Sequence, residues 1–131
     1  MTQPDAFEQV AKRLCQERGW GLGANRFEVP FESGRRQEVH FALFEFEDQR
    51  RVRLHSRIGS TRAIAPARLQ HGLDLNFGLP WGALAVHDDE LVLVETLAVG
   101  GDAAEQLGAC VAYLAETADR LERTMFGTDA G

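Results

Sequence analysis

The most regular pattern in the chain is an apolar stripe in its last third, with steps of three and four residues. It runs through residues 102–126, and this spacing places its members on one side of a helix. The stripe consists of Leu107, Val111, Leu114, Ala118, Leu121 and Met125. Such a stripe packs on a sheet or on another helix, so we expect the helix to cover the sheet of its own domain. Because about 25 helical residues span roughly 37 Å, we expect the far end, with Leu121 and Met125, to reach a second subunit.

Spacing and turn residues predict two further helices and five strands. Helical spacing covers residues 4–18, and Pro66 begins a shorter helix that ends near Gly78. The glycine-rich segment 19–25 is expected to be a loop. Strands are expected at residues 26–31, 37–47, 51–58, 81–87 and 90–97.

The order of these elements predicts an α+β fold, α-β-β-β-α-β-β-α, with one antiparallel five-stranded sheet and three helices. The 131 residues fit a single domain, residues 1–131, and residues 127–131 are expected to be a frayed tail. The last strand is apolar on both of its faces, which is typical of a central strand. We therefore expect its Leu91 and Leu93 to line a surface that a partner covers.

The register of the middle hairpin follows from charge pairing if residues 48–50 form a three-residue loop. Glu45 then opposes Arg53 and Glu47 opposes Arg51 on a polar face. We interpret these two arginines as cross-strand ion pairs, which contribute little stability when they are exposed.

The same register predicts a mixed surface on the polar face. Apolar and basic side chains lie together there: Phe41, Leu43, His55 and Arg57. Apolar groups on a charged face favour a partner that covers them, whereas Arg57 by itself suits either an ion pair or a docking face. Phe44 and Phe46 are expected on the opposite, apolar face. The predicted partner-binding residues are thus Phe41, Leu43, His55, Arg57, Leu91, Leu93, Leu121 and Met125.

Charge argues against general binding of nucleic acid. The formal net charge is -6, with 20 acidic and 14 basic residues, whereas phosphate neutralisation needs an excess of basic ones. The charge is uneven, because residues 35–68 hold eight arginines and four acids while residues 88–131 hold ten acids and two arginines. The predicted register also places Phe44 and Phe46 away from the arginines, whereas single-stranded nucleic acid prefers aromatic and basic side chains on one surface.

The sequence offers no recognisable catalytic or metal-binding motif. The four histidines, His40, His55, His71 and His87, form no HxxxH or HExxH pair, so neither a metal nor a cofactor is expected. Cys15 and Cys110 lie in helical patterns and are expected to be free, buried thiols. No apolar run approaches the ~20 residues of a membrane span, and the N-terminus lacks the pattern of a signal peptide.

The element order and several short segments resemble a known superfamily. The segments are Leu75-Asn76, residues 82–86 (GALAV), residues 90–94 (ELVLV) and residues 118–121 (ADRL). They resemble the type III secretion chaperone-like fold, which contains the class I Tir-chaperone family and the YbjN-like "sensory transduction regulator" family. The resemblance is best between residues 69 and 123. It implies an acidic, cytoplasmic bacterial protein, usually a homodimer, without enzymatic activity.

The resulting hypothesis is a non-enzymatic protein-binding module, a dimeric chaperone or regulator that binds an extended segment of a partner protein. Whether it is closer to the secretion chaperones or to the YbjN-like regulators stays open. The alternative is a small-ligand sensor or an enzyme with a pocket near Trp81 and the Gly19–Gly23 loop.

Overall fold

The computed structural model describes residues 6–100 and 103–127 of the chain. Its elements follow in the order α1 (Ala6–Arg18), β1 (Gly21–Gly23), β2 (Arg26–Pro30), β3 (Arg36–Phe46), β4 (Gln49–Ser60), α2 (Pro66–Asp74), β5 (Ala83–His87), β6 (Glu90–Ala98) and α3 (Ala103–Phe126). Short 3₁₀ turns at Thr61–Ala63 and Leu75–Gly78 flank α2. The predicted helices and strands are therefore all present, with small shifts at their ends.

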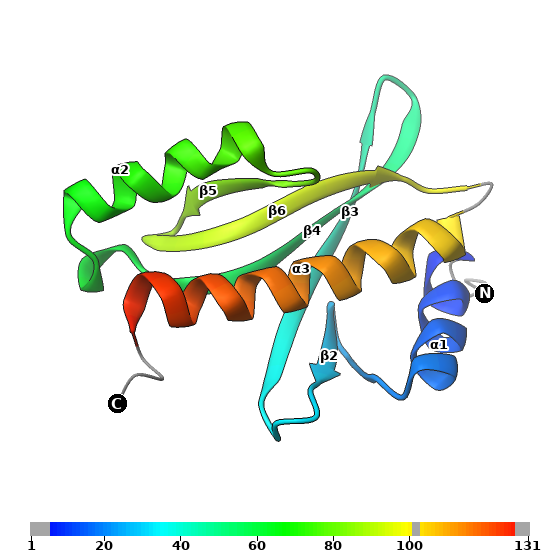
Figure 1. Cartoon of the computed structure of the whole chain (residues 1–131). Coiled ribbons are helices and arrows are strands. Elements are labelled where there is room, and N and C mark those ends of the chain that lie inside the picture. The colour runs from blue at the N-terminus through cyan, green and yellow to red at the C-terminus, as the bar shows by residue number, and fades with distance from the viewer. Residues whose placement is uncertain (1–5, 101–102, 128–131) are drawn as a thin grey trace.

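The strands form one antiparallel sheet in the order β1-β2-β3-β4-β6-β5 (Figure 1). Consecutive strands pair as hairpins except at one point, where β6 lies between β4 and β5. The predicted central position of the strand at 90–97 is thereby confirmed. The outer edge of β5 is covered in part by Asn76, whose amide group exchanges hydrogen bonds with the backbone of Leu84. This contact occupies backbone groups that an edge strand otherwise leaves unpaired.

The three helices of the described chain pack on one face of this sheet. The long α3 crosses β3, β4 and β6 (Figure 1). Its predicted apolar stripe is buried against them. Helix α1 closes one end of the core, where the rings of Phe7 and Phe27 each lie close to Phe41, at 5.1 and 5.2 Å between centroids. Helix α2 packs beside the last turns of α3, where Arg68 donates a hydrogen bond to the carbonyl of Met125.

A buried carboxylate joins α3 to the turn between β2 and β3. Asp119 accepts hydrogen bonds from Nε and Nη2 of Arg35, at 3.0 and 2.7 Å, and pairs with Arg123 at 3.3 Å. The Asp119 side chain is only 7% exposed, so these partners provide the compensation that a buried charge requires. The contact fixes the start of β3 against the helix layer.

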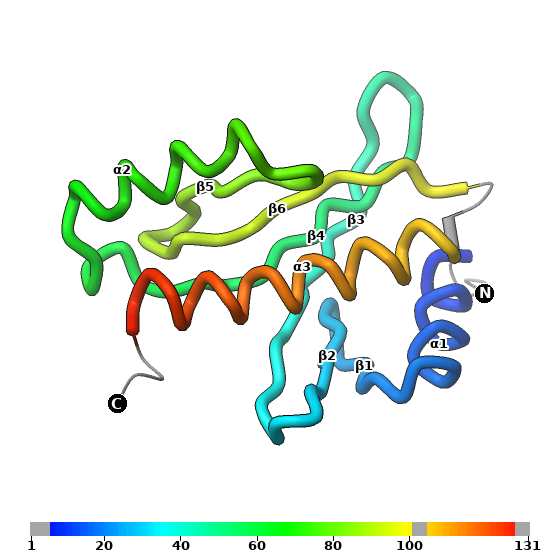
Figure 2. Tube along the Cα trace, in the orientation of Figure 1, coloured from blue at the N-terminus to red at the C-terminus, as the bar shows by residue number. Residues whose placement is uncertain are grey.

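The described sheet has six strands, and the prediction of five was wrong. The additional strand, β1, lies within the segment predicted as a loop and pairs with β2 through Leu22 opposite Phe27 (Figure 2). Its sequence, GLG, has no β-branched residue and no alternation, so no strand signal marks it. It forms because a two-residue turn, Ala24 and Asn25, returns the chain directly onto β2, with Asn25 at a positive φ of 63°.

The register of the β3–β4 hairpin also differs from the prediction. The loop has two residues, Glu47 and Asp48, both at positive φ (53° and 62°), and Phe46 pairs directly with Gln49. This is the backbone of the tight hairpin turn that usually carries Asn or Gly. Glu45 therefore lies opposite Arg50 and not opposite Arg53.

The shorter turn exchanges the two faces of β3. Phe41 and Leu43 lie on the side of Leu54 and Val52, against the helix layer, and not beside His55 and Arg57 as predicted. Phe44 and Phe46 lie on the other face, with the arginines. The error has a physical cause, because a shift of the pairing by an odd number of residues moves every side chain of a strand to the opposite face.

The predictions for the two ends of the chain can be compared with the structure only in part. The predicted start of the first helix at residue 4 and most of the predicted tail lie outside the described residues. Gly127 is described, and it ends α3 with a φ of 61° and a hydrogen bond from its N–H to the carbonyl of Arg123. Such a left-handed glycine is a common end of a helix.

Candidate functional site

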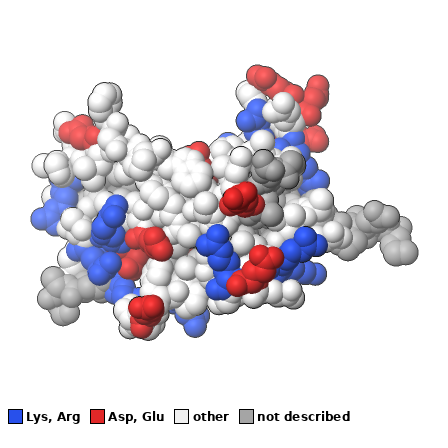
Figure 3. Space-filling model, turned by 45° about the vertical axis from the view of Figure 1, so that its right-hand side comes forward, with Lys and Arg blue, Asp and Glu red and all other residues white. Residues whose placement is uncertain are grey.

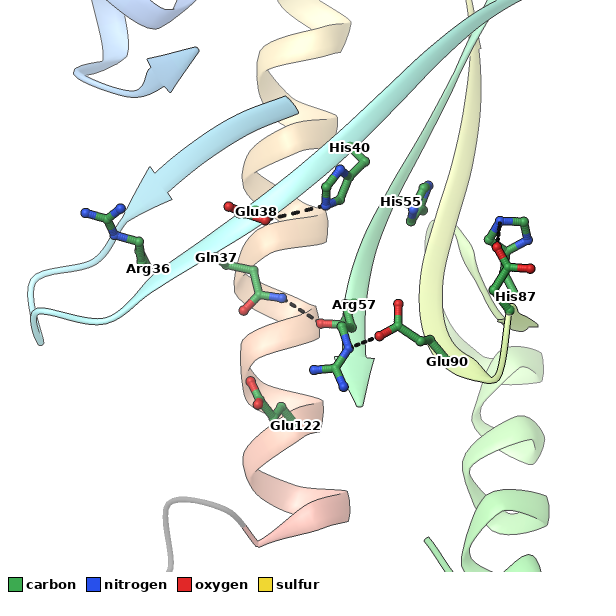
Figure 4. A pocket seen from close by; sticks show the side chains of 10 residues that line it. Arg36, Gln37, Glu38, His40, His55, Arg57, His87, Glu90 and Glu122 are labelled. Carbon is green, nitrogen blue, oxygen red and sulfur yellow. Dashed lines mark hydrogen bonds and ion pairs between the residues drawn. The ribbon is translucent and has the colours of Figure 1, made fainter. Parts of the chain in front are cut away.

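The main candidate surface is the sheet face turned away from the three helices, which we call the open face. Along β4, Val52, Leu54 and Ser56 are buried on the helix side, whereas the alternate residues point to the open face. Figure 4 views this face, with α3 behind the strands. The β3–β4 hairpin extends beyond the body of the molecule (Figure 1), and acidic side chains gather at its tip (Figure 3). The open face is therefore a broad surface whose side chains do not contribute to the main core.

Three of the four histidines of the chain meet on the open face. His40 lies directly opposite His55 in the β3–β4 ladder, with their rings stacked at 5.3 Å between centroids. The ring of His87 lies 6.0 Å from that of His55, on the other side (Figure 4). Burial lowers the pKa of His55, the two neighbouring histidines lower it further, and Glu90 opposes this effect. His55 is thus held in its neutral form more strongly than an ordinary histidine.

Next to the histidines, a polar cleft opens where Gln37 reaches from β3 to β4. Its Nε2 donates to Ser56 Oγ at 2.9 Å and to the carbonyl of Arg57 at 2.7 Å. Ser56 in turn donates to the carbonyl of Glu38. Side chains thereby join the two strands beyond the paired part of their ladder, and the cleft has a volume of about 410 Å³. Its lining residues are Arg36, Gln37, Glu38, His40, His55, Arg57, His87, Asp88, Glu90 and Glu122.

Most charges in this cleft already have a partner within the chain. Arg57 forms an ion pair with Glu90, and His40 lies 3.5 Å from Glu38 (Figure 4). Of the two interpretations given for Arg57, the structure shows the ion pair, and its role in docking stays a prediction. The cleft is polar and internally balanced, which makes it a weak site for a further charged ligand.

A second depression, which we call the hollow, lies on the other side of His55 and His87. Its volume is about 430 Å³, and its floor is formed by small and branched apolar residues: Ala42, Ala85, Val92 and Val94. The half-exposed Val86 lies at its edge, on β5. Arg53, His55 and His87 complete the lining. Val92 is only 3% exposed although it lies outside the main core cluster. The hollow is therefore an apolar area on the open face with basic groups around it.

Two arginines beside the hollow stack on aromatic rings. The Arg53 guanidinium lies 4.3 Å from the ring centroid of Phe44, and that of Arg51 lies 5.5 Å from that of Phe46. The predicted pairing of these arginines with Glu45 and Glu47 does not occur in the ladder, because the register differs. Arg51 donates to the side chain of Gln49, and its buried Nε has no hydrogen-bond partner. The structure thus places cation–π contacts where the sequence predicted cross-strand ion pairs.

The structure separates the predicted partner-binding residues into two groups. Only His55 and Arg57 lie on the open face. The remaining six pack in or against the core: Phe41, Leu43, Leu91, Leu93, Leu121 and Met125. Leu91 and Leu93 are fully buried, because they are on the helix side of β6. Binding of Leu91 and Leu93 to a partner stays a prediction, but the folded chain does not expose these two side chains on its surface.

The hollow and the histidine row, which consists of His40, His55 and His87, were not predicted from the sequence. A two-residue turn at residues 47–48 would have placed His40 opposite His55 and Phe44 opposite Arg51. That turn carries Glu and Asp in place of the Asn-Gly pair that marks such hairpins. The alternation along the strand at 51–58 was the usable signal, and it correctly placed Arg51, Arg53, His55 and Arg57 on one face.

Other candidate chemistry is limited in the residues that the structure describes. No three His, Cys, Asp or Glu side chains among them converge on a point that could hold a metal ion. Cys15 and Cys110 are free and buried, as predicted. Burial, and to a smaller extent Glu95, raises the pKa of Cys110 to about 12, and burial raises the pKa of Cys15, so both thiols stay protonated at neutral pH. Trp81 packs against Tyr113 and lines neither the cleft nor the hollow.

No helix in the described part of the chain is both long and apolar enough to cross a membrane.

Comparison with known proteins gives a match in structure alone. No protein-family model matches the chain, and no curated protein matches it in sequence. Among solved structures, the chain is similar to the crystal structure of YbjN from E. coli, with a TM-score of 0.48 and 15% sequence identity. The match covers 97% of this chain and 93% of that one.

Proposed function

We propose that the protein is a non-enzymatic protein-binding module whose open face binds an extended segment of a partner protein. The observation that carries this proposal is the one-sided sheet, with three helices on one face and an apolar hollow on the other. Apolar area left on the surface of a folded domain commonly marks an interaction site. The lack of a recognisable catalytic motif in the sequence is consistent with binding as the main activity.

The shape of the hollow favours an extended chain. Two of the residues that line it, Ala42 and Ala85, have small side chains and so leave space for a ligand side chain. Arg53, His55 and His87 complete the lining. A polypeptide in an extended conformation presents alternate side chains to one surface at intervals of about 7 Å. It can therefore place apolar groups in the hollow and polar groups on the basic residues beside it.

A homodimer is the second part of the proposal. The segment from the end of α2 exposes Leu73, Leu75 and Phe77, and Phe77 is completely exposed. Such side chains suit a contact between two copies of the chain, on a part of the surface distinct from the hollow. The resulting protein would be a cytoplasmic dimer of the chaperone or regulator kind, with one open face on each subunit.

Site-specific photo-crosslinking tests the binding surface. A photoreactive amino acid is placed at Val94, in the hollow, or at Ala109, which is exposed on α3. In the native host we expect one reproducible protein partner from position 94, mapped by mass spectrometry to a single segment, and no such product from position 109. Equal products from the two positions, or none from position 94, would contradict the proposal.

A further inference from the structure

The hollow is distinguished from the rest of the open face by its charge. Its ionisable lining residues are Arg53, His55 and His87, and no carboxylate is among its lining residues. This differs from the chain as a whole, whose net charge is -6. The hollow therefore carries the positive charge of Arg53 without a carboxylate among its lining residues, and electrostatic complementarity favours an acidic partner.

Arg53 is the group on this surface that is most available to an anion. Two other open-face arginines are in ion pairs, Arg26 with Glu28 and Glu38 and Arg57 with Glu90. Arg51 is half-buried and donates a hydrogen bond to Gln49. Among the described residues, Arg53 has a contact with the ring of Phe44 and no ion pair. Its side chain is exposed, so its guanidinium donors are free to bind an oxygen anion from outside.

The contact with Phe44 also orients the guanidinium. Stacking on a ring, at 4.3 Å from its centroid, restricts the rotation of a long side chain before any ligand binds. An arginine held in this way loses less conformational entropy when it binds a carboxylate, and its planar group suits the two oxygens of a carboxylate. Arg53 lies next to the apolar floor, so one ligand can use both features.

We propose that the hollow recognises an acidic extended segment, in which an apolar side chain occupies the floor and a neighbouring Asp or Glu binds Arg53. The two ligand side chains would be separated by one residue, because alternate residues of an extended chain point to the same side. This inference rests on the proposed function and specifies the chemistry of the partner. Single-stranded nucleic acid is the competing occupant, because Arg51 and Arg53 stack on Phe46 and Phe44.

The charge around the hairpin favours the peptide over the nucleic acid. Glu45, Glu47 and Asp48 surround the tip, and each is exposed, so a phosphate backbone that followed the two Arg–Phe pairs would meet these carboxylates. Binding of nucleic acid also depends on several phosphate contacts, whereas this face has few unpaired arginines. A single carboxylate at Arg53 needs no such series of contacts.

Fluorescence anisotropy with labelled synthetic peptides tests the inference. The probe ESVTESVTE places Glu and Val alternately on one face when extended; one control peptide has Lys in place of Glu, and another has Ser in place of Val. We expect the probe to bind at least about tenfold more tightly than either control and to weaken as salt increases.

Three variants connect this binding to the hollow. Arg53→Gln is expected to weaken the probe about tenfold, and Ala85→Leu is expected to weaken it by filling the floor. Arg120→Gln removes the same charge from an exposed position on α3 and should leave the affinity unchanged. Circular dichroism and urea unfolding verify that each variant is folded.

Several outcomes would overturn the inference. They are equal binding of the acidic and basic peptides, equal binding by the Arg53→Gln and Arg120→Gln proteins, and displacement of the probe by an oligothymidine at low salt. If any one of these outcomes occurs while position 94 still crosslinks to one protein, the inference fails and the proposed function stands. If that crosslink is also missing, both fail.

Discussion

Single residues on the open face connect stability to pH through the histidine row. His55 is the central member, between His40 and His87, and its pKa is lowered chiefly by burial. A base whose pKa is lower in the folded chain than in the unfolded chain takes up a proton on unfolding. Stability is therefore retained at neutral and higher pH and is lost as the pH falls.

The first prediction concerns this pH dependence. The free energy of unfolding should begin to decrease as the pH falls below about 6.5, the ordinary pKa of histidine, and the decrease should end below the lowered pKa of His55. Urea unfolding between about pH 8 and about pH 5 measures it. His55→Gln should reduce the slope, whereas His71→Gln, at an exposed position on α2, should leave it unchanged. An identical slope in His55→Gln and the unmodified protein would contradict the prediction.

The second prediction concerns a close contact at Gly59, beside an irregularity in the β4–β6 ladder. A Cβ atom at Gly59 would lie 2.5 to 2.7 Å from three ring atoms of Phe126. Gly59→Ala should therefore lower the free energy of unfolding by about 1–3 kcal/mol, because the ring has to move. Gly78→Ala is the matched control, since a Cβ there meets nothing within 4 Å.

Urea unfolding of these variants also tests the cause. If the ring of Phe126 is responsible, Gly59→Ala should cost less stability in a Phe126→Ala background than in the unmodified chain. The same cost in the two backgrounds would show that the backbone, and not the ring, sets the requirement for glycine.

At the scale of elements, the β3–β4 turn has the largest effect on the open face, because it decides which side chains of β3 reach that face. Glu47 and Asp48 hold left-handed backbone conformations that cost a non-glycine residue roughly 1 kcal/mol or more. Replacing them together with Asn and Gly should therefore raise the free energy of unfolding by about 1 kcal/mol while the register is kept. The urea midpoint measures this third prediction, and a decrease in the midpoint would contradict it.

Much of the architecture could be predicted from the sequence because it depends on long, periodic signals. The stripe of α3 and the alternation of β4 extend over many residues, so single exceptions do not hide them. The register of β3 could not be predicted in the same way, because this strand carries apolar residues on both faces: Phe41 and Leu43 on one, Phe44 and Phe46 on the other. With two apolar faces, charge pairing and loop length had to decide, and the loop length was wrong.

The candidate site could not be predicted because the predicted register of β3 was wrong. The hollow combines residues of β3, β4, β5 and β6, and its basic edge depends on which face of β3 lies beside Arg53. Short elements were the other source of error, since β1 has three residues and forms through its pairing with β2. Such features depend on contacts between segments, which a pattern within one segment does not contain.

At the scale of the whole molecule, the fourth prediction concerns assembly. Exposed apolar residues at the end of α2, Leu73, Leu75 and Phe77, support the proposed homodimer. Light scattering should give the mass of a dimer for the unmodified protein, and Phe77→Ser should shift the mass toward that of a monomer of 14.5 kDa. Leu22→Ser, on an edge strand and 37% exposed, is the control. A monomeric unmodified protein would contradict the prediction.

The one-sided sheet leads to the fifth prediction, which compares two neighbours on β6. Leu93 is fully buried beneath the helices, whereas Val94 lines the hollow on the open face. Leu93→Lys should lower the free energy of unfolding by about 3 kcal/mol or more, because it buries an unpaired charge. Val94→Lys should cost less than about 1 kcal/mol, since its ammonium group reaches solvent. Similar losses of stability in the two variants would mean that Val94 is as much a part of the core as Leu93. The proposed binding surface would then have to lie elsewhere on the molecule.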